Sequence, residues 1–150
     1  GMRQRGVHRK DICVVEDCYN AGPDSMKAAI HAFGSMQRPA KGACRKIFIM
    51  GDMLELGPFA PALHTEVGEC LGREKIDCLI AVGEMSAYIA QGAQDSGVPQ
   101  VHHCPDKEAA KTLLEQVIRP DSTILVKASR GMQMEELTAF LMEHTTPAKN

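Results

Sequence analysis

Short apolar runs alternate along this chain with longer segments in which apolar residues recur every three or four positions. Apolar runs of about four to eight residues are typical of buried strands, and the longer periodic segments are typical of amphipathic helices. We expect strands at residues 12–15, 47–50, 78–82, around 101 and at 123–126. We expect helices at residues 24–36, 60–73, 85–95, 106–118 and 134–143.

The order of these segments predicts the fold class. Strands that alternate with helices of this length form right-handed βαβ units, which build a mostly parallel sheet with helices on both faces. A chain of 150 residues has the size of one domain. We therefore expect residues 1–150 to form a single α/β domain with about six strands. The remaining strand is expected at the basic start of the chain, as an antiparallel edge strand. The basic residues there are Arg3, Arg5, Arg9 and Lys10.

Polar residues follow the predicted strands. Because the carboxyl ends of parallel strands lie along one edge of a sheet, we expect these residues to converge on one crevice, where ligands bind in such folds. They are Glu16 to Asn20, Gly51-Asp52, Gly83-Glu84, His102-His103 and Lys127 to Arg130.

Acidic residues at two of these strand ends are candidates for ligand binding. Glu16 and Asp17 are suited to hold a cation or to accept hydrogen bonds from ribose hydroxyls. Asp52 follows Gly51, a residue that lets the backbone approach a ligand closely. Both positions have a structural alternative, since acidic residues are common at solvated strand ends and Gly-Asp is ordinary turn chemistry.

The last predicted strand is followed by two cations and a hydroxyl. Lys127, Ser129 and Arg130 share one strand-to-helix loop, a combination that suits a carboxylate or a phosphate. The alternative is a pair of exposed basic residues.

Three other polar positions are interpreted as structural. Asp24-Ser25 is expected to cap the helix that follows it. His64 lies at helical spacing between Leu63 and Val67 and is expected to border the surface of its helix. His102-His103 has no further ligand at metal-binding spacing.

Composition and charge disfavour several classes of partner. The net charge is −2 and 24% of residues are charged, which does not indicate nucleic-acid binding. The cysteines form no C-x-x-C pair, so we expect reduced thiols in a cytoplasmic protein and no zinc site. No apolar run reaches the ~18–20 residues that span a bilayer, and no signal peptide is recognised. The glycine-rich motifs of P-loop, dinucleotide-binding and hydrolase sites are absent.

Three separated segments resemble the Mur ligase family. They are EDCYNAGPDSM at residues 16–26, GDMLELG at residues 51–57 with His64 and Glu66-Val67-Gly68 after it, and VKASRGMQMEEL at residues 126–137. They follow the family's order and span nearly the whole chain. The similarity is to the C-terminal domain of these ligases, above all of the type that adds D-Ala-D-Ala to UDP-MurNAc-tripeptide.

The resemblance implies a Rossmann-like third domain of an ATP-dependent ligase of peptidoglycan synthesis, without the N-terminal and central domains. In such ligases the central domain holds ATP and magnesium and activates the precursor carboxylate as an acyl phosphate, which the amine of the dipeptide attacks. The C-terminal domain closes over the site, positions the reactants and excludes water. The domain alone is expected to be inactive.

The resemblance also assigns roles to individual residues. Asp17 would contact the ATP ribose, and Tyr19 and Asn20 would lie near the adenine. The residues expected to face the dipeptide and phosphate are Asp52, Lys127, Ser129 and Arg130. No catalytic residue and no metal ligand is assigned to this domain.

The chain departs from the usual family patterns D-D-S-Y-N-A-N-P and K-G-S-R. Glu16, Cys18 and Gly22 replace the first Asp, the Ser and the second Asn, and Ala128 replaces the Gly. Gly22 removes a side chain from the nucleotide turn. Ala128 would be unfavourable if its position required a positive φ.

Two other functions remain open from the residues themselves. An acidic pair after the first buried strand, Asp52 after the second and Lys127 after the last would suit a receiver-like module that binds magnesium and is phosphorylated. The other alternative is a non-catalytic interaction domain.

Overall fold

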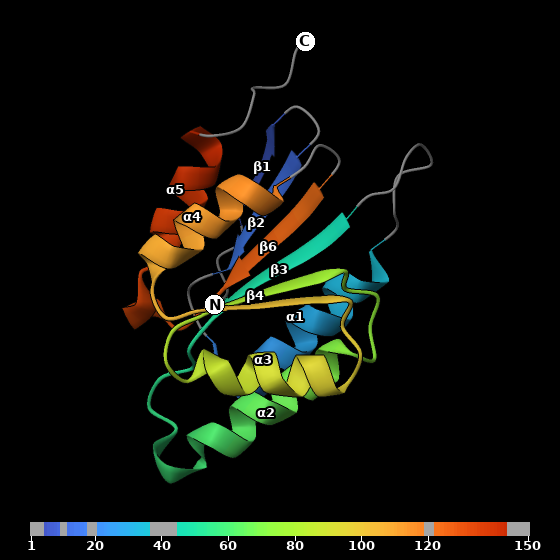
Figure 1. Ribbon diagram of the computed structural model, residues 1–150, viewed down its shortest axis with the longest axis vertical. Coiled ribbons are helices and arrows are strands. Elements are labelled where there is room, and N and C mark those ends of the chain that lie inside the picture. The colour runs from blue at the N-terminus through green and yellow to red at the C-terminus, as the bar shows by residue number, and fades with distance from the viewer. Residues whose placement is uncertain (1–4, 10–11, 18–20, 37–44, 119–121, 144–150) are drawn as a thin grey trace.

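The computed structural model describes residues 5–9, 12–17, 21–36, 45–118 and 122–143, with side chains from residue 21 onward. A six-stranded sheet has the order β1-β2-β6-β3-β4-β5 (Figure 1). The strands are β1 (Arg5–Arg9), β2 (Ile12–Asp17), β3 (Arg45–Gly51), β4 (Cys78–Val82), β5 (Gln100–Cys104) and β6 (Ser122–Lys127). The helices are α1 (Pro23–Ser35), α2 (Ala60–Leu71), α3 (Ser86–Asp95), α4 (Lys107–Val117) and α5 (Glu135–Glu143), with short 3-10 turns η1 (Gly57–Phe59) and η2 (Arg130–Met132).

Strands β2, β6, β3, β4 and β5 run parallel to one another, and β1 pairs antiparallel with β2. Helices lie between successive parallel strands in the chain, as crossover connections require. The structure confirms the predicted α/β fold with a parallel sheet. Within the basic start, Arg3 and Lys10 lie outside the described residues.

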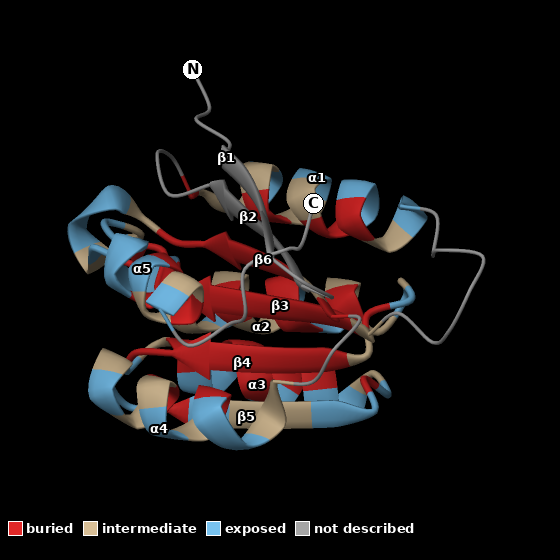
Figure 2. Ribbon diagram, turned by 90° about the horizontal axis from the view of Figure 1, so that it is seen from above, coloured by how far each residue is buried: buried red, intermediate tan, exposed pale blue. Residues whose placement is uncertain are grey.

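Helices cover both faces of the sheet. On one face α1, α2 and α3 pack against side chains such as Phe48 and Met50 of β3. On the other face α4 and α5 pack against Ile47 and Ile49 of the same strand (Figure 1). Strands β3 and β4 are therefore buried along nearly their whole length, while the outer faces of the helices are exposed (Figure 2). Burial on both faces explains why these strands are continuous apolar runs.

Helix α4 begins where the sequence predicts, and α1 begins slightly earlier. Asp106 is the N-cap of α4, and its Oδ1 accepts a hydrogen bond of 2.8 Å from the N–H of Ala109. The N-cap of α1 is Gly22, not the predicted Asp24-Ser25. Ser25 still takes part in capping, because its hydroxyl oxygen accepts a hydrogen bond of 3.1 Å from the N–H of Gly22.

Helices α2 and α3 pack closely because glycines lie at their contact. A Cβ at Gly68 would lie 2.1 Å from the carbonyl oxygen of Ile89, and a Cβ at Gly92 would lie 2.3 Å from the carbonyl oxygen of Thr65. A residue larger than glycine at either position would push the helices apart. The α2–α3 pair is thus a rigid support for the loops that follow β3 and β4.

Candidate functional site

The parallel strands place five loops at one edge of the sheet, which we call the carboxyl edge. These loops follow Asp17, Gly51, Val82, Cys104 and Lys127. The loops after β2, β6 and β3 carry most of the candidate residues. They are neighbours, because Lys127 of β6 pairs in register with Asp17 of β2 on one side and with Met50 of β3 on the other. The predicted convergence of these backbone segments is confirmed. Tyr19 and Asn20, the predicted adenine contacts, lie outside the described residues.

Asp52 directs its carboxylate toward the start of α3. Its Oδ1 accepts hydrogen bonds of 2.7 Å from both the backbone N–H and the hydroxyl of Ser86, and its Oδ2 accepts one of 3.2 Å from the N–H of Met85. A carboxylate stabilises the unpaired N–H groups and the positive end of a helix dipole. The side chain is only 8% exposed. Asp52 therefore joins the loop after β3 to α3, whereas the sequence predicts that it faces the dipeptide and phosphate.

Gly83 makes room for this carboxylate. Its φ is +121°, a conformation that favours glycine, and a Cβ there would lie 2.5 Å from Oδ1 of Asp52. The backbone N–H of Gly83 donates a hydrogen bond of 2.9 Å to the carbonyl of Cys104. The loop after β4 is thus fixed between Asp52 and β5.

His64 is fully buried, and its predicted position at the helix surface is wrong. Its Nε2 accepts a hydrogen bond of 3.0 Å from the N–H of Met53, and its Nδ1 donates one of 2.7 Å to the carbonyl of Ala60. This pair of partners requires the neutral ring with the proton on Nδ1. The histidine anchors the residue after Asp52 to the first turn of α2. Sequence periodicity missed this contact because it spans a loop and a helix.

Ser129 connects the loops that follow three different strands. Its hydroxyl oxygen accepts a hydrogen bond of 2.9 Å from the N–H of Leu54, and the hydroxyl donates one of 3.3 Å to the carbonyl of Ala21. Its backbone N–H donates one of 3.3 Å to the carbonyl of Asp52. The predicted substrate-binding serine therefore holds the carboxyl edge together.

The two cations of the last loop lie in different surroundings. Lys127 is 0% exposed, whereas Arg130 is exposed. Between them Ala128 is buried, and its methyl group occupies the space that a Cβ at Gly51 would need. Ala128 does not have a positive φ, so the anticipated backbone penalty does not arise. Four residues are predicted to face the dipeptide and phosphate, and the structure describes the side chains of all four. Among them, Arg130 is the exposed one.

Arg130 lies in the 3-10 turn η2, which is closed by backbone hydrogen bonds. The N–H of Met132 donates to the carbonyl of Ser129 at 2.9 Å, and the N–H of Gln133 donates to the carbonyl of Arg130 at 3.1 Å. Gln133 ends the turn with a φ of 52°, a conformation that is uncommon for residues other than glycine. The turn therefore presents Arg130 at the carboxyl edge in a defined and locally strained backbone.

The histidine pair lies within β5 and not after it, because the strand extends to Cys104. His103 donates a hydrogen bond of 2.7 Å from Nε2 to the carbonyl of Gly83. The pair is thus part of an edge strand and supports the loop after β4. Among the described residues, no group of three or more His, Cys, Asp or Glu side chains is arranged to hold a metal ion.

The described thiols are free cysteines, namely Cys70, Cys78 and Cys104. Burial raises the pKa of Cys78 to about 11, more than the Arg45 cation lowers it. Burial also raises the pKa of Cys104, with a further contribution from Asp106. A protonated thiol is a poor nucleophile, so Cys78 and Cys104 are core residues. The side chains of Cys13 and Cys44 lie outside the part of the chain whose side chains the structure describes.

The fold and the carboxyl edge define the class of the protein. It is a parallel α/β domain in which polar loops from the carboxyl ends of neighbouring strands are joined into one surface, the usual position of a ligand site in open α/β sheets. No helix among the described residues has the length and apolarity needed to cross a membrane.

Comparison with known proteins identifies the family. Residues 2–130 match the family described as "Mur ligase, glutamate ligase domain". The chain is 36% identical over 133 residues to the UDP-N-acetylmuramoyl-tripeptide--D-alanyl-D-alanine ligase of Bacillus subtilis, which covers 88% of this chain and 28% of that protein. The Escherichia coli ligase of the same name is 36% identical over 135 residues, covering 89% of this chain and 27% of that protein. The chain therefore belongs to the Mur ligase family.

Solved structures share the fold. A MurF structure from Acinetobacter baumannii superposes with a TM-score of 0.77 at 27% identity, covering 93% of this chain and 30% of that one. The fold also matches a MurF ligase from Thermotoga maritima solved in complex with ADP, with a TM-score of 0.71 at 22% identity, covering 93% of this chain and 30% of that one. The chain spans somewhat over a quarter of the length of these relatives.

Proposed function

We propose that this chain acts as the C-terminal domain of an ATP-dependent ligase that adds D-Ala-D-Ala to UDP-MurNAc-tripeptide in peptidoglycan synthesis. The observation that carries the proposal is the 36% identity over 133 residues to a ligase of that name. The chain corresponds to only 28% of that protein. The N-terminal and central domains of the same ligase are therefore its proposed partners, and the cytoplasm, where ATP is available, is its proposed location.

In this proposal the preceding domains hold ATP and magnesium and form the acyl phosphate. The present chain contributes contacts from the carboxyl edge. Asp17, the last residue of β2, is proposed to meet the ribose, and Tyr19 and Asn20 are proposed to lie near the adenine. Because most phosphate contacts belong to the other domains, we expect the chain alone to bind ATP weakly, which calorimetry would show.

Arg130 is the proposed direct contact to the carboxylate of the dipeptide or to a phosphate. It is exposed and sits in a closed turn, and a guanidinium binds such planar anions through two parallel hydrogen bonds. Asp52 and Ser129 are proposed to act behind it by fixing the loops, since their polar atoms contact α3 and the neighbouring loops. Lys127 is proposed to supply positive charge from beneath the surface.

The receiver-like alternative requires an aspartate that can attack a phosphoryl donor. The carboxylate of Asp52 accepts three hydrogen bonds from the start of α3 and is 8% exposed. An oxygen held in this way is a poor nucleophile, because attack would break the hydrogen bonds that join Asp52 to the start of α3. The geometry therefore favours the ligase domain.

The test is to mix this chain with the separately expressed N-terminal and central domains and to measure phosphate release that depends on D-Ala-D-Ala. We expect activity only in the complete mixture. Arg130→Gln should raise the KM for the dipeptide, whereas Arg73→Gln, at an exposed position beyond the C-terminus of α2, should not. A folded mixture in which the domains associate but form no amide would contradict the proposal.

A further inference from the structure

The turn that carries Arg130 is held on one side by Ser129 and on the other by a lysine from α4. Lys107 donates hydrogen bonds from Nζ to the carbonyl oxygen of Gln133 at 3.4 Å and to Oε1 of Glu136 at 3.1 Å. Gln133 closes the turn and Glu136 lies in the first turn of α5. The lysine thus contacts both the strained end of the turn and the helix that follows.

The position of Lys107 is unfavourable for its own helix. It is the first residue of α4, directly after the N-cap Asp106, where the helix dipole disfavours a positive charge. The contact with α5 compensates for this, because Glu136 and the Gln133 carbonyl provide negative charge in another element. The side chain of Lys107 is 23% exposed and that of Glu136 is 49% exposed, so the pair is partly shielded from water.

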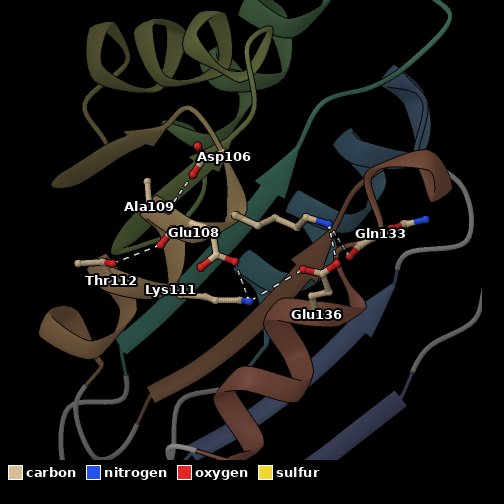
Figure 3. Close-up of polar contacts among 8 residues, drawn as sticks. Asp106, Glu108, Ala109, Lys111, Thr112, Gln133 and Glu136 are labelled. Carbon is tan, nitrogen blue, oxygen red and sulfur yellow. Dashed lines mark hydrogen bonds and ion pairs between the residues drawn. The ribbon is translucent and has the colours of Figure 1, made fainter.

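Lys111, one turn further along α4, provides a comparison. Its Nζ lies 3.1 Å from Oε1 of Glu108 within the same helix and 3.9 Å from Oε2 of Glu136 (Figure 3). Its hydrogen bond is to Glu108 on α4 itself, not to the turn. Lys107 and Lys111 therefore have the same charge and share Glu136, but Lys107 alone of the two bonds to the Gln133 carbonyl.

We propose that Lys107 is a positioning residue for Arg130. By bonding to the Gln133 carbonyl it stabilises a backbone conformation with a φ of 52°, which costs free energy and persists only where neighbours support it. The N–H of the same residue closes the turn by donating to the carbonyl of Arg130. Loss of the lysine would allow Gln133 to relax, and the guanidinium would then sample a wider range of positions. The inference rests on the proposed ligase function.

The test uses the complete ligase, with Lys107→Met, Lys107→Arg, Lys111→Met and Arg130→Gln. We expect Lys107→Met to raise the KM for D-Ala-D-Ala about threefold to fivefold with little change in kcat, the size expected for losing a partly exposed ion pair. Lys107→Arg should restore the KM, and Lys111→Met should leave it unchanged. In the Arg130→Gln background, Lys107→Met should have no further effect. An equal additional effect there, or an unchanged KM in the single variant, would overturn the inference.

Hydrogen exchange in this chain separates the inference from the proposed function. We expect the amides of Met132 and Gln133 to exchange faster in Lys107→Met but not in Lys111→Met, with the melting temperature unchanged. Unchanged exchange would overturn the role of Lys107 whatever the activity. If the wild-type ligase forms no amide, the proposed function fails, and the exchange rates still decide whether Lys107 holds the turn.

Discussion

Oδ1 of Asp52 lies 2.7 Å from both the backbone nitrogen and the hydroxyl oxygen of Ser86, a residue 34 positions later in the chain. The contact joins the loop after β3 to the start of α3 and is almost completely buried. The sequence around Asp52 is typical of a ligand-binding acid, but its carboxylate instead accepts hydrogen bonds from the start of α3. The carboxyl edge is therefore a connected framework of hydrogen bonds before any ligand is considered.

The first prediction concerns the stability provided by this contact. Asp52→Ala should lower the free energy of unfolding by about 2–4 kcal/mol, because it removes the carboxylate at the start of α3 and leaves buried N–H groups without an acceptor. Asp106→Ala is the matched control, since Asp106 caps α4 at an exposed position, and it should cost about 1 kcal/mol. Urea unfolding of both variants gives the comparison. Equal losses would show that burial of the Asp52 contact contributes nothing.

The second prediction concerns the space that Gly83 leaves for Asp52. Gly83→Ala should cost about 3–4 kcal/mol, because it combines an unfavourable positive φ with a clash against the carboxylate. Gly97→Ala is the control, because Gly97 also has a positive φ, +95°, but a Cβ there meets nothing within 4 Å. It should cost about 1–2 kcal/mol.

The Asp52→Ala background sharpens that comparison. With the carboxylate removed, Gly83→Ala should cost no more than Gly97→Ala, which urea unfolding of the double variant would measure. If Gly83→Ala still lowers the free energy of unfolding by about 3–4 kcal/mol in this background, the added methyl group does not clash with Asp52. The two residues would then not be energetically coupled.

The sequence was sufficient to predict where the carboxyl edge lies. The period of the apolar residues indicates the strands and helices. Parallel strands then bring the backbones of Asp17, Asp52 and Lys127 to the same edge, irrespective of how their side chains are oriented. The starts of α3 and α4 were likewise predicted within one residue, because capping and turn residues act locally.

The orientation of the side chains could not be predicted in this way. Asp52 turns to α3 because the close packing of Gly68 and Gly92 fixes the α2–α3 pair, and because Gly83 leaves room beside it. His64 is buried because a loop folds back over its helix and offers the N–H of Met53. Such contacts depend on how whole elements pack, so residue type and spacing alone indicate a ligand site and a structural contact equally well.

The third prediction concerns Ser129 as the link between loops. Ser129→Ala should accelerate hydrogen exchange at the amide of Leu54, which loses its acceptor, and should lower the free energy of unfolding by about 1 kcal/mol. Thr112→Ala is the control, because it also removes a hydroxyl but from an exposed helical position where the hydroxyl donates to the carbonyl of Glu108. It should leave the Leu54 amide unchanged. If Leu54 exchanges at the wild-type rate in Ser129→Ala, the serine does not hold the loop.

The fourth prediction concerns the buried thiol of Cys78, whose pKa is raised from 9.0 to about 11. Above the ordinary value the unfolded chain loses this proton while the folded chain keeps it, so the stability that is fully present below pH 9.0 falls as the pH approaches about 11. The slope from this one group is at most about 1.4 kcal/mol per pH unit. The same burial should protect the thiol from iodoacetamide in the folded state.

Cys78→Ala tests this dependence on pH. The variant should be less stable at neutral pH because it leaves a small cavity, but its stability should decline less steeply between pH 9.0 and about 11. Cys70→Ala is the matched control for the loss of a thiol, because Cys70 is a free cysteine that is only half-buried on α2. All other groups are common to the three proteins, so the difference between the urea unfolding curves is the measured quantity. Parallel declines in Cys78→Ala and the wild type would mean that the folded protein does not hold the Cys78 proton more tightly than the unfolded chain does.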